Sequence, residues 1–257
     1  MSYVVITGAS SGIGKEFAKR FAKRDFDLLL VATNEEKLLK AKEEINEDFN
    51  VNILTLISDL SKNDGAKAVY DYVISNNLNV SCFVNNAGFG DFGFFTETDL
   101  NKEINMIDTN IRAVHILTKS FLKDMEKRDS GYILNVASSA AFQPGPLMAT
   151  YYATKSYVYQ LTEAIYYEQK KKKSNVHVSV LCPGPVATNF NNVANVNFAV
   201  KPLTSEYVAR YAIDNMFKEK MLIIPGFKMK CAKFFGRFVS DKFLLRMAYR
   251  IQRRKVK

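Results

Sequence analysis

Three side chains in the middle of the chain have the types and spacing needed for proton transfer. Tyr151 and Lys155 are four residues apart in a stretch with helical spacing, so both lie on one face of a helix. An ammonium group beside a phenol favours the phenolate, so we expect Lys155 to lower the Tyr151 pKa from its ordinary value of about 10. Ser138, thirteen residues upstream of the tyrosine, adds a hydroxyl group. A tyrosine tuned in this way can donate or accept a proton near neutral pH.

A glycine-rich segment near the start of the chain predicts a phosphate-binding turn. Gly8, Gly12 and Gly14 follow an apolar run and precede a stretch with helical spacing. Glycines permit a tight turn and let backbone amides approach a pyrophosphate at the N-terminus of a helix. The spacing is a variant of the usual dinucleotide fingerprint. A P-loop is not expected, because Lys15 is followed by Glu16 in place of serine or threonine and the glycine spacing differs.

Neighbouring residues compete for the catalytic roles. The next residue, Tyr152, has Lys155 only three positions away, and Ser139 is the second choice for the hydroxyl group. His115 and His177 lie in a helical stretch and an apolar run, where we expect structural roles. No cluster of metal-ligating residues is present in the sequence, so we predict no metal site.

Apolar runs alternate with longer amphipathic stretches along most of the chain. Several runs are continuously rich in Val, Ile and Leu, as strands buried on both faces should be. Strand–helix alternation predicts an α/β fold, a doubly wound parallel sheet with helices on both faces. The expected strands lie in residues 3–6, 27–32, 51–57, 80–84, 131–137, 176–182 and 221–224, and the expected helices in 12–24, 34–47, 62–76, 100–127 and 150–173.

The positive charge is concentrated at one end of the chain. The 257 residues carry a net charge of +10, and the part after Pro225 contains eleven basic residues and one acid, Asp241. The first 225 residues therefore sum to zero. We expect one catalytic domain over residues 1–225 and a basic amphipathic extension over 226–257.

Composition and cysteine content indicate a cytoplasmic protein. The residues are 47% hydrophobic and 24% charged, and no apolar run approaches the ~20 residues of a membrane-spanning helix. No basic leader precedes the first apolar run, so no signal peptide is expected. Cys82, Cys182 and Cys231 are far apart and form no C-x-x-C motif, so we expect reduced thiols.

In order and spacing, these motifs resemble those of the short-chain dehydrogenase/reductase family. The resemblance runs from Thr7 to about Thr188 and implies a seven-stranded Rossmann fold that binds NAD or NADP. The site is then expected at the carboxyl ends of the strands. The matching segments are Thr7-Gly-Ala-Ser-Ser-Gly-Ile-Gly14, Ser58-Asp59-Leu60, Asn85-Asn-Ala-Gly88, Asn110, Ser138, Tyr151-x-x-x-Lys155 and Pro183-Gly-Pro-Val-Ala-Thr188.

The resemblance also implies roles for the matching residues. Tyr151 would be the general acid in carbonyl reduction, or the base in the reverse direction, and Ser138 would hold the substrate oxygen. Lys155 would lower the tyrosine pKa and bind the nicotinamide ribose, while Asn110 would order a water in the proton relay behind it. The implied cofactor-binding residues are Gly8, Ser10, Ser11, Gly12, Ile13, Gly14, Thr33, Asn34, Asp59, Leu60, Asn86, Ala87, Gly88, Tyr151, Lys155, Pro183, Val186 and Thr188.

The end of the second expected strand favours NADP over NAD. An acid at that place would bind the ribose hydroxyls of NAD and repel a 2′-phosphate, but the strand ends in Ala32, Thr33 and Asn34. Thr33, Asn34 and Lys37 can hold a phosphate. The arginine common at the Thr33 position in phosphate-binding relatives is missing, and so is the basic residue often found at the Ser11 position, so NAD stays open as the alternative.

Aromatic residues gather in the segments expected around the substrate. An apolar pocket follows if about half of them point inward, although a core role is equally open. We therefore expect an apolar ketone, such as a 3-oxoacyl chain, a steroid-like compound or a xenobiotic carbonyl. Residues 189–203 are expected to close over it. The aromatic residues are Phe89, Phe92, Phe94, Phe95, Phe142, Phe190 and Phe198.

The basic extension predicts one or two amphipathic helices with a break near Gly236 or Ser240-Asp241. Its apolar face can pack on the parent domain or on a second subunit. A basic, Phe-rich stretch such as 228–257 can also lie on an anionic membrane surface. We expect a homo-oligomer, a dimer or a tetramer, and no binding of nucleic acid.

The sequence therefore predicts an NADP-preferring oxidoreductase that reduces an apolar carbonyl compound, with Tyr151 as the proton donor. One alternative is an NAD-dependent alcohol or hydroxysteroid dehydrogenase that works oxidatively. Another is a member that binds the dinucleotide without catalysis.

Overall fold

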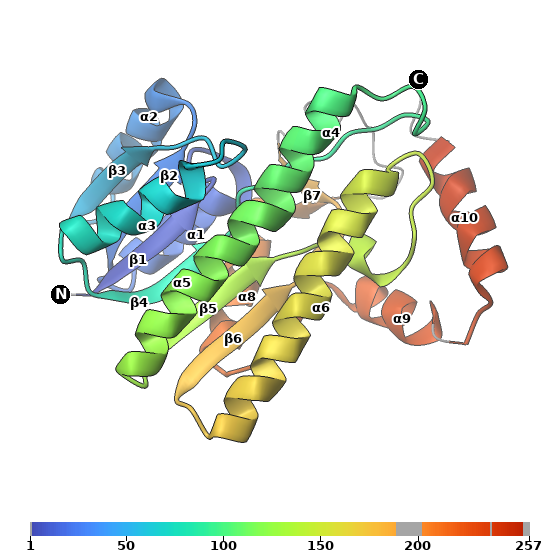
Figure 1. Ribbon diagram of the computed structural model, residues 1–257. Coiled ribbons are helices and arrows are strands. Elements are labelled where there is room, and N and C mark those ends of the chain that lie inside the picture. Colours follow the sequence, from blue (N-terminus) through green and yellow to red (C-terminus); the bar gives the residue numbers. More distant parts are fainter. Residues whose placement is uncertain (1, 189–201, 237, 254–257) are drawn as a thin grey trace.

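Seven parallel strands form a single sheet in the order β3-β2-β1-β4-β5-β6-β9 (Figure 1). The computed structural model describes residues 2–188, 202–236 and 238–253. Each predicted run coincides with a strand to within two residues, which confirms the predicted fold class. The strands are β1 Tyr3–Thr7, β2 Asp27–Ala32, β3 Ile53–Ile57, β4 Val80–Asn85, β5 Gly131–Val136, β6 Val176–Leu181 and β9 Leu222–Ile223.

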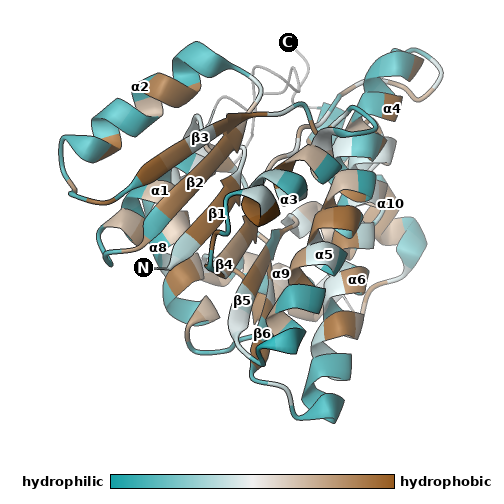
Figure 2. Cartoon of the chain, turned by 60° about the vertical axis from the view of Figure 1, so that its left-hand side comes forward, coloured by the Kyte–Doolittle hydropathy of each residue, from teal (hydrophilic) through white to brown (hydrophobic). Residues whose placement is uncertain are grey.

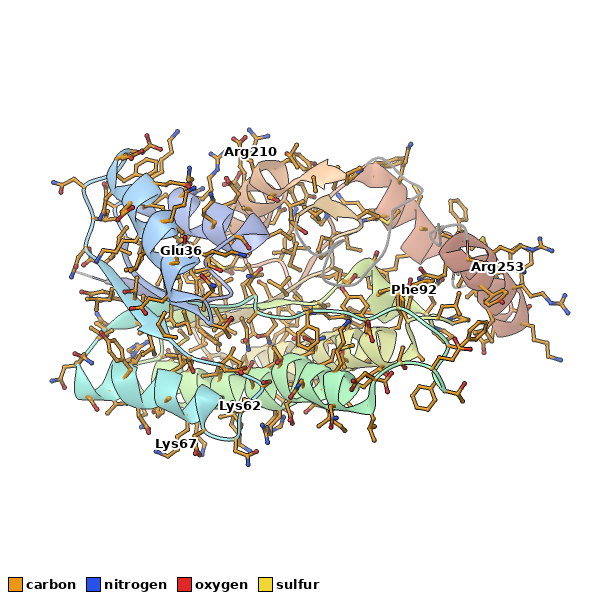
Figure 3. All side chains as sticks on the ribbon, turned by 90° about the horizontal axis from the view of Figure 1, so that it is seen from above. Glu36, Lys62, Lys67, Phe92, Arg210 and Arg253 are labelled. Carbon is orange, nitrogen blue, oxygen red and sulfur yellow. The ribbon has the colours of Figure 1, made fainter. Side chains whose placement is uncertain are left out.

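The strands are mostly apolar on both sides because helices cover both faces of the sheet (Figure 2). In Figure 3, Arg210 of one layer and Lys67 of the other lie at opposite edges, with the sheet between them. The first layer contains α1 Gly12–Ala22, α2 Glu35–Asn46 and α8 Ser205–Met216, and the second contains α3 Gly65–Ser75, α5 Val114–Lys127 and α6 Ala149–Lys172.

The predicted helix over 100–127 was wrong in one respect, because it is not a uniform α-helix. A π-helical turn, Asp108–Ala113, separates α4, Leu100–Ile107, from α5. A π turn is rare and is often found at functional sites. Asn110 lies inside it.

A second, small sheet was not predicted. Strands β7, Val186–Ala187, and β8, Leu203–Thr204, pair in parallel beside α8. Two-residue strands are too short to carry a recognisable pattern. The segment 189–203, which is expected to close over substrate, lies almost entirely outside the described residues.

The order of the strands reverses between β1 and β4. The chain moves outward from β1 to β3, then returns to place β4 on the other side of β1. Loops after these two strands therefore diverge and leave a crevice at the carboxyl edge of the sheet, where such folds place their ligands. Gly8 follows β1 and Asn86 follows β4, so both lie at this crevice.

The basic extension folds into α9, Phe227–Gly236, and α10, Asp241–Arg253, beside the amino-terminal end of α6 (Figure 1). Lys233 of α9 donates a hydrogen bond to the Tyr159 hydroxyl over 2.7 Å. Ala248 and Gln252 of α10 are buried against the domain. Both helices thus pack on the parent domain through one face. Within the described ranges, no helix is long and apolar enough to span a bilayer.

Candidate active site

The glycine-rich turn after β1 can be built only with glycine at its key positions. Gly8 and Gly12 have φ angles of +66° and +55°, in the left-handed region that disfavours larger residues. At Gly14 a Cβ atom would lie 2.1 Å from the Gly8 carbonyl oxygen. The first turn of α1 therefore packs directly against the backbone of the turn.

The loop after β4 braces this turn. The Thr7 hydroxyl accepts hydrogen bonds of 3.0 Å from the backbone N–H groups of Asn86 and Ala87. The Asn86 side chain donates to the carbonyl oxygens of Thr7, at 2.9 Å, and of Gly8, at 3.2 Å. Asn86 therefore fixes the shape of the cradle.

The cradle fits a nucleotide diphosphate. The backbone N–H groups of the first turn of α1 point toward the crevice, and that turn carries no acidic residue. The partial positive charge at this helix end favours a bound anion. Ser10, Ser11, Gly12 and Ile13 line the crevice with the two other glycines. These residues would hold the pyrophosphate of a nicotinamide dinucleotide, which supplies or accepts the hydride when bound.

Tyr151 and Ser138 meet at the inner end of the crevice. Tyr151 is in the first turn of α6 and is 9% exposed, and Ser138 follows β5 by two residues. The two hydroxyl groups are hydrogen bonded to each other. The Ser138 side chain also caps the 3₁₀ turn Ser139–Phe142 by accepting the Ala140 N–H at 3.1 Å. The pair can therefore hold one oxygen atom between two hydroxyl groups.

Lys155 is buried one helical turn beyond Tyr151. Its Nζ atom lies 5.9 Å from the centre of the Tyr151 ring and donates to the Val136 carbonyl oxygen at 3.0 Å. The side chain is on the face of α6 predicted from the spacing. Burial disfavours the ammonium and lowers the Lys155 pKa to about 8.

The expected lowering of the Tyr151 pKa is wrong for the ligand-free protein. Burial raises this pKa well above its ordinary value, and the hydrogen bond with Ser138 opposes the rise only in part. Lys155 loses its proton near pH 8, before the phenol ionises, so no ammonium charge is present to stabilise the phenolate. Tyr151 is therefore protonated at neutral pH.

Asn110 supports the site from behind. Its amide donates to the Phe89 carbonyl oxygen at 2.9 Å and to the Thr154 hydroxyl at 3.1 Å, and accepts the Phe89 N–H at 3.2 Å. A Cβ atom on Gly88 would lie 2.8 Å from Asn110 Oδ1 and 3.1 Å from Lys155 Nζ. The π turn thus brings Asn110 between the β4 loop and α6. Its expected role in a proton relay stays a prediction.

A cavity of about 360 Å³ joins the cradle to Tyr151, Ser138 and Lys155. Most residues implied by the resemblance line it, and the structure brings them together from five separate segments. Those that do are Gly8, Ser10, Ser11, Gly12, Ile13, Gly14, Asn86, Ala87, Gly88, Ser138, Tyr151, Lys155, Pro183, Val186 and Thr188.

Five of the expected residues do not line this cavity. Thr33 and Asn34 are exposed after β2, and the Asn34 side chain caps α2 by accepting the Lys37 N–H at 2.8 Å. Asp59 is exposed and binds the Ser61 N–H, while Leu60 is buried in the core. Asn110, as described above, is fully enclosed. The adenosine contacts expected of the first four stay predictions.

The aromatic pocket was predicted only in part. Phe89 lines the cavity, and Phe92 packs in the cluster around Tyr151, on the α10 side of the molecule (Figure 3). Phe94 and Phe95 are 52% and 68% exposed, and Phe142 belongs to a different cluster with Tyr159. Phe190 and Phe198 lie outside the described residues. Residues that were not predicted to line the pocket complete the apolar wall, namely Val136, Ala140, Met148, Tyr152 and Pro185.

A buried chain of polar side chains under the site was also missed. Asn85 of β4 donates to Thr118 at 3.3 Å, Thr118 donates to Asn135 at 3.1 Å, and Asn135 donates to Thr162 at 3.0 Å. This row of hydrogen bonds therefore ties β4, α5, β5 and α6 together. A single polar residue in a strand or helix gives no pattern, so only the packing of these helices on the sheet reveals the contacts.

Replacing Lys155 by methionine should stabilise the ligand-free protein while removing its activity. Below about pH 8 the native state buries an ammonium group that the unfolded chain exposes to water. The unfolded state thus binds more protons between about pH 8 and 10.5, and the wild-type protein gains stability as pH rises through that window. The gain in stability of Lys155→Met over the wild type should be full at pH 7 and should fade as the pH approaches 10.5. Each kcal/mol corresponds to about 2–4 °C in Tm.

Thermal unfolding of the two proteins across this pH range measures the effect. Lys119→Met, at an exposed lysine of α5, controls for the loss of one positive charge. A Lys155→Met protein that is less stable than wild type at pH 7 would contradict the assigned cost of burial.

A doubly wound sheet that brings a pyrophosphate cradle against a buried phenol, serine and lysine places the protein among the oxidoreductases that depend on a nicotinamide dinucleotide. The family model described as short chain dehydrogenase matches residues 2–197. The chain belongs to this family.

Three known proteins illustrate the relationship. The chain is 32% identical over 214 residues to a very-long-chain 3-oxoacyl-CoA reductase of Anas platyrhynchos, covering 80% of this chain and 66% of that protein. It is 32% identical over 198 residues to 17-beta-hydroxysteroid dehydrogenase type 3 of Mus musculus, covering 75% and 63%. The chain thus spans slightly less than two thirds of these relatives. A short-chain dehydrogenase from Sphingobium yanoikuyae in complex with NADPH has the same fold, with a TM-score of 0.84, 24% identity and 95% of each chain covered.

Proposed function

We propose that the protein is a carbonyl reductase in which Tyr151 donates the proton, with NADP preferred over NAD. The observation that carries the proposal is the hydrogen-bonded pair of buried Tyr151 and half-buried Ser138 at the inner end of the dinucleotide cradle. Two hydroxyl groups that converge on one point suit a carbonyl oxygen that gains negative charge.

Each residue has a distinct task in this proposal. Ser138 binds the substrate oxygen and orients the carbonyl carbon toward the crevice. Tyr151 would transfer its proton to that oxygen, and the dinucleotide, when bound, would supply the hydride to the carbonyl carbon. Lys155, with a pKa near 8, is poised to resupply a proton toward the phenol at neutral pH. Asn110 holds the β4 loop against α6 and so keeps Lys155 in place.

The protonation state of Tyr151 favours reduction over oxidation. Carbonyl reduction needs a protonated phenol, whereas alcohol oxidation needs a phenolate that can accept a proton. Burial raises the Tyr151 pKa and keeps the phenol protonated at neutral pH. This supports the reductase proposal over the oxidative alternative.

The preference for NADP is supported by the carboxyl end of β2. Thr33 and Asn34 are exposed there, and neither carries a negative charge. Lys37, in the first turn of α2, adds a cation on an exposed surface. A 2′-phosphate would meet the N-terminus of a helix with no acid at its cap, although Glu35 and Glu36 follow in the first turn.

An apolar ketone, either a 3-oxoacyl chain or a steroid-like compound, is the proposed substrate. The names of the relatives and the apolar wall made by Phe89, Met148 and Tyr152 support this class. Oxidation of NADPH and of NADH with ketones graded by size and apolarity tests it. We expect turnover with NADPH to exceed turnover with NADH. Faster oxidation of secondary alcohols with NAD would favour the dehydrogenase alternative. The absence of turnover in either direction would favour the non-catalytic alternative.

We further propose that the basic extension attaches the protein to an anionic membrane surface. Phe243, Met247 and Ile251 recur every four residues on α10 and form one stripe that is 40–56% exposed. Arg246 and Arg250 lie beside it with the same spacing. On α9 and beyond it, Phe227, Phe234, Phe235 and Phe238 are 57–79% exposed. Exposed aromatic residues among cations suit the boundary of a lipid layer with negative head groups.

Replacing the α10 stripe with Phe243→Ser, Met247→Ser and Ile251→Ser should release the protein from anionic vesicles. Sedimentation with phosphatidylcholine vesicles, with and without phosphatidylserine, measures the bound fraction. The wild type should sediment only with the anionic vesicles. A matched triple variant, Leu39→Ser, Ile57→Ser and Ile74→Ser, removes apolar residues of similar exposure elsewhere and should sediment as the wild type does. Equal sedimentation of both triple variants would contradict the proposal.

The expected homo-oligomer and the cytoplasmic location stay predictions. Light scattering of the purified protein measures the number of copies.

A further inference from the structure

A second cavity of about 600 Å³ lies next to the catalytic cavity. It is bordered by the segment 141–146, the first turns of α6 and Leu245 of α10, and it is open to solvent, since Ala153 on its wall is exposed. Its volume is in the range of small-molecule sites. The lining residues that the structure describes carry no charge and are mostly apolar, among them Phe142, Pro144, Pro146, Ala149, Ala153 and Leu245.

Tyr152 forms the wall that the two cavities share. Its ring lies on Gly145, where a Cβ atom would come within 2.3–2.4 Å of three ring atoms. The ring also meets Tyr151 edge to face, with 6.2 Å between ring centres. The second cavity therefore begins one side chain away from the proposed proton donor.

Gln252 connects α10 to this wall. Its Nε2 atom donates to the Tyr152 hydroxyl at 2.5 Å, and the side chain is almost completely buried. Its Oε1 atom has no hydrogen-bond partner among the residues that the structure describes.

The catalytic cavity leaves little room beyond the reacting carbonyl. Its 360 Å³ extends from the cradle to Tyr151, so the nicotinamide end of the cofactor would occupy much of it. A substrate with a long apolar part therefore needs additional space. The second cavity is the adjoining space, and its lining matches hydrocarbon in polarity.

We propose that the second cavity binds the distal hydrocarbon part of the carbonyl substrate. This inference rests on the proposed reductase function. The reacting carbonyl lies at Ser138 and Tyr151, the chain crosses the Tyr152 ring, and the far end packs against Ala153 and Leu245. Helix α10 is then part of the substrate site, positioned by the contact between Gln252 and Tyr152.

Filling the second cavity tests the proposal. Ala153→Phe places a large side chain in it without touching the catalytic cavity, and Ala164→Phe makes the same change at an exposed position farther along α6. A long-chain 3-oxoacyl thioester should lose about tenfold in kcat/KM with Ala153→Phe, which is about 1.4 kcal/mol. The acetoacetyl thioester of the same carrier should change less than about twofold, and Ala164→Phe should affect neither.

A binding assay without turnover separates this proposal from the proposed function. Fluorescence of a polyene fatty acid should report a bound chain in the wild type and in Ala164→Phe, and weaker binding in Ala153→Phe. If no carbonyl compound is reduced but this pattern of probe binding holds, the reductase proposal fails, whereas the second cavity still binds a hydrocarbon chain. If a folded Ala153→Phe protein keeps the wild-type kinetics with the long-chain thioester and the wild-type probe binding, the hydrocarbon-binding proposal is overturned. If the oligomeric state of that variant also changes, the second cavity is instead an interface between copies of the protein.

Discussion

Tyr151→Phe should reduce kcat by about 10²–10⁴-fold, the range of general acid catalysis, while cofactor affinity stays within a few-fold of wild type. The substitution removes only the hydroxyl group. The ring keeps its packing against Met106, Ala140 and Met148, so the fold and the cavity walls should persist. Single-turnover oxidation of NADPH gives the rate, and quenching of protein fluorescence gives the affinity.

Tyr157→Phe is the matched control. Tyr157 is on the same helix, and its hydroxyl bonds His115 Nδ1 at 2.7 Å, away from the cavity. Its removal should leave kcat within about twofold, as for a surface change. Equal rates for Tyr151→Phe and wild type would remove Tyr151 from the reaction and leave the dinucleotide-binding role as the better account.

Gly14→Ala should abolish dinucleotide binding and destabilise the protein. The new Cβ atom would meet the Gly8 carbonyl oxygen at 2.1 Å and the Asn86 amide at 2.7 Å. The clash is with backbone, so the turn itself must move, and overpacking of this kind costs about 1–3 kcal/mol or more. Because the displaced turn is the cradle, we expect cofactor Kd to rise at least about a hundredfold, or about 2.7 kcal/mol.

Calorimetric titration with NADPH, together with thermal unfolding, measures both effects. Gly236→Ala is the control, because a Cβ atom there has no neighbour within 4 Å. It should bind NADPH as the wild type does. Unaltered NADPH affinity in Gly14→Ala would mean that the dinucleotide binds elsewhere.

The sheet and the proximity of Tyr151 to Lys155 were predictable because each depends on a local pattern. Buried parallel strands are continuously apolar, and Tyr151 and Lys155 share a helix face at any i, i+4 spacing. The glycine turn was predictable because few other residues adopt a positive φ at Gly8 and Gly12.

Features that depend on distant neighbours were not predictable in this way. The π turn at Asn110 is held by Phe89 and Thr154, which lie on other elements. The raised Tyr151 pKa follows from its burial, whereas the spacing of Tyr151 and Lys155 showed only their proximity. The inward-facing aromatic residues could not be separated from Phe94 and Phe95, because an irregular loop has no period that reports orientation.

The two faces of α10 have different surroundings, although only the diameter of a helix, about 10–12 Å, separates them. Gln252 on the inner face touches the wall of both cavities, while Phe243, Met247 and Ile251 are exposed on the outer part. With that outer part seated in a lipid leaflet, a poorly water-soluble ketone would travel only the thickness of one helix from the bilayer to the enzyme. Its supply would then follow its partitioning into the leaflet, and the dissolved concentration would matter little.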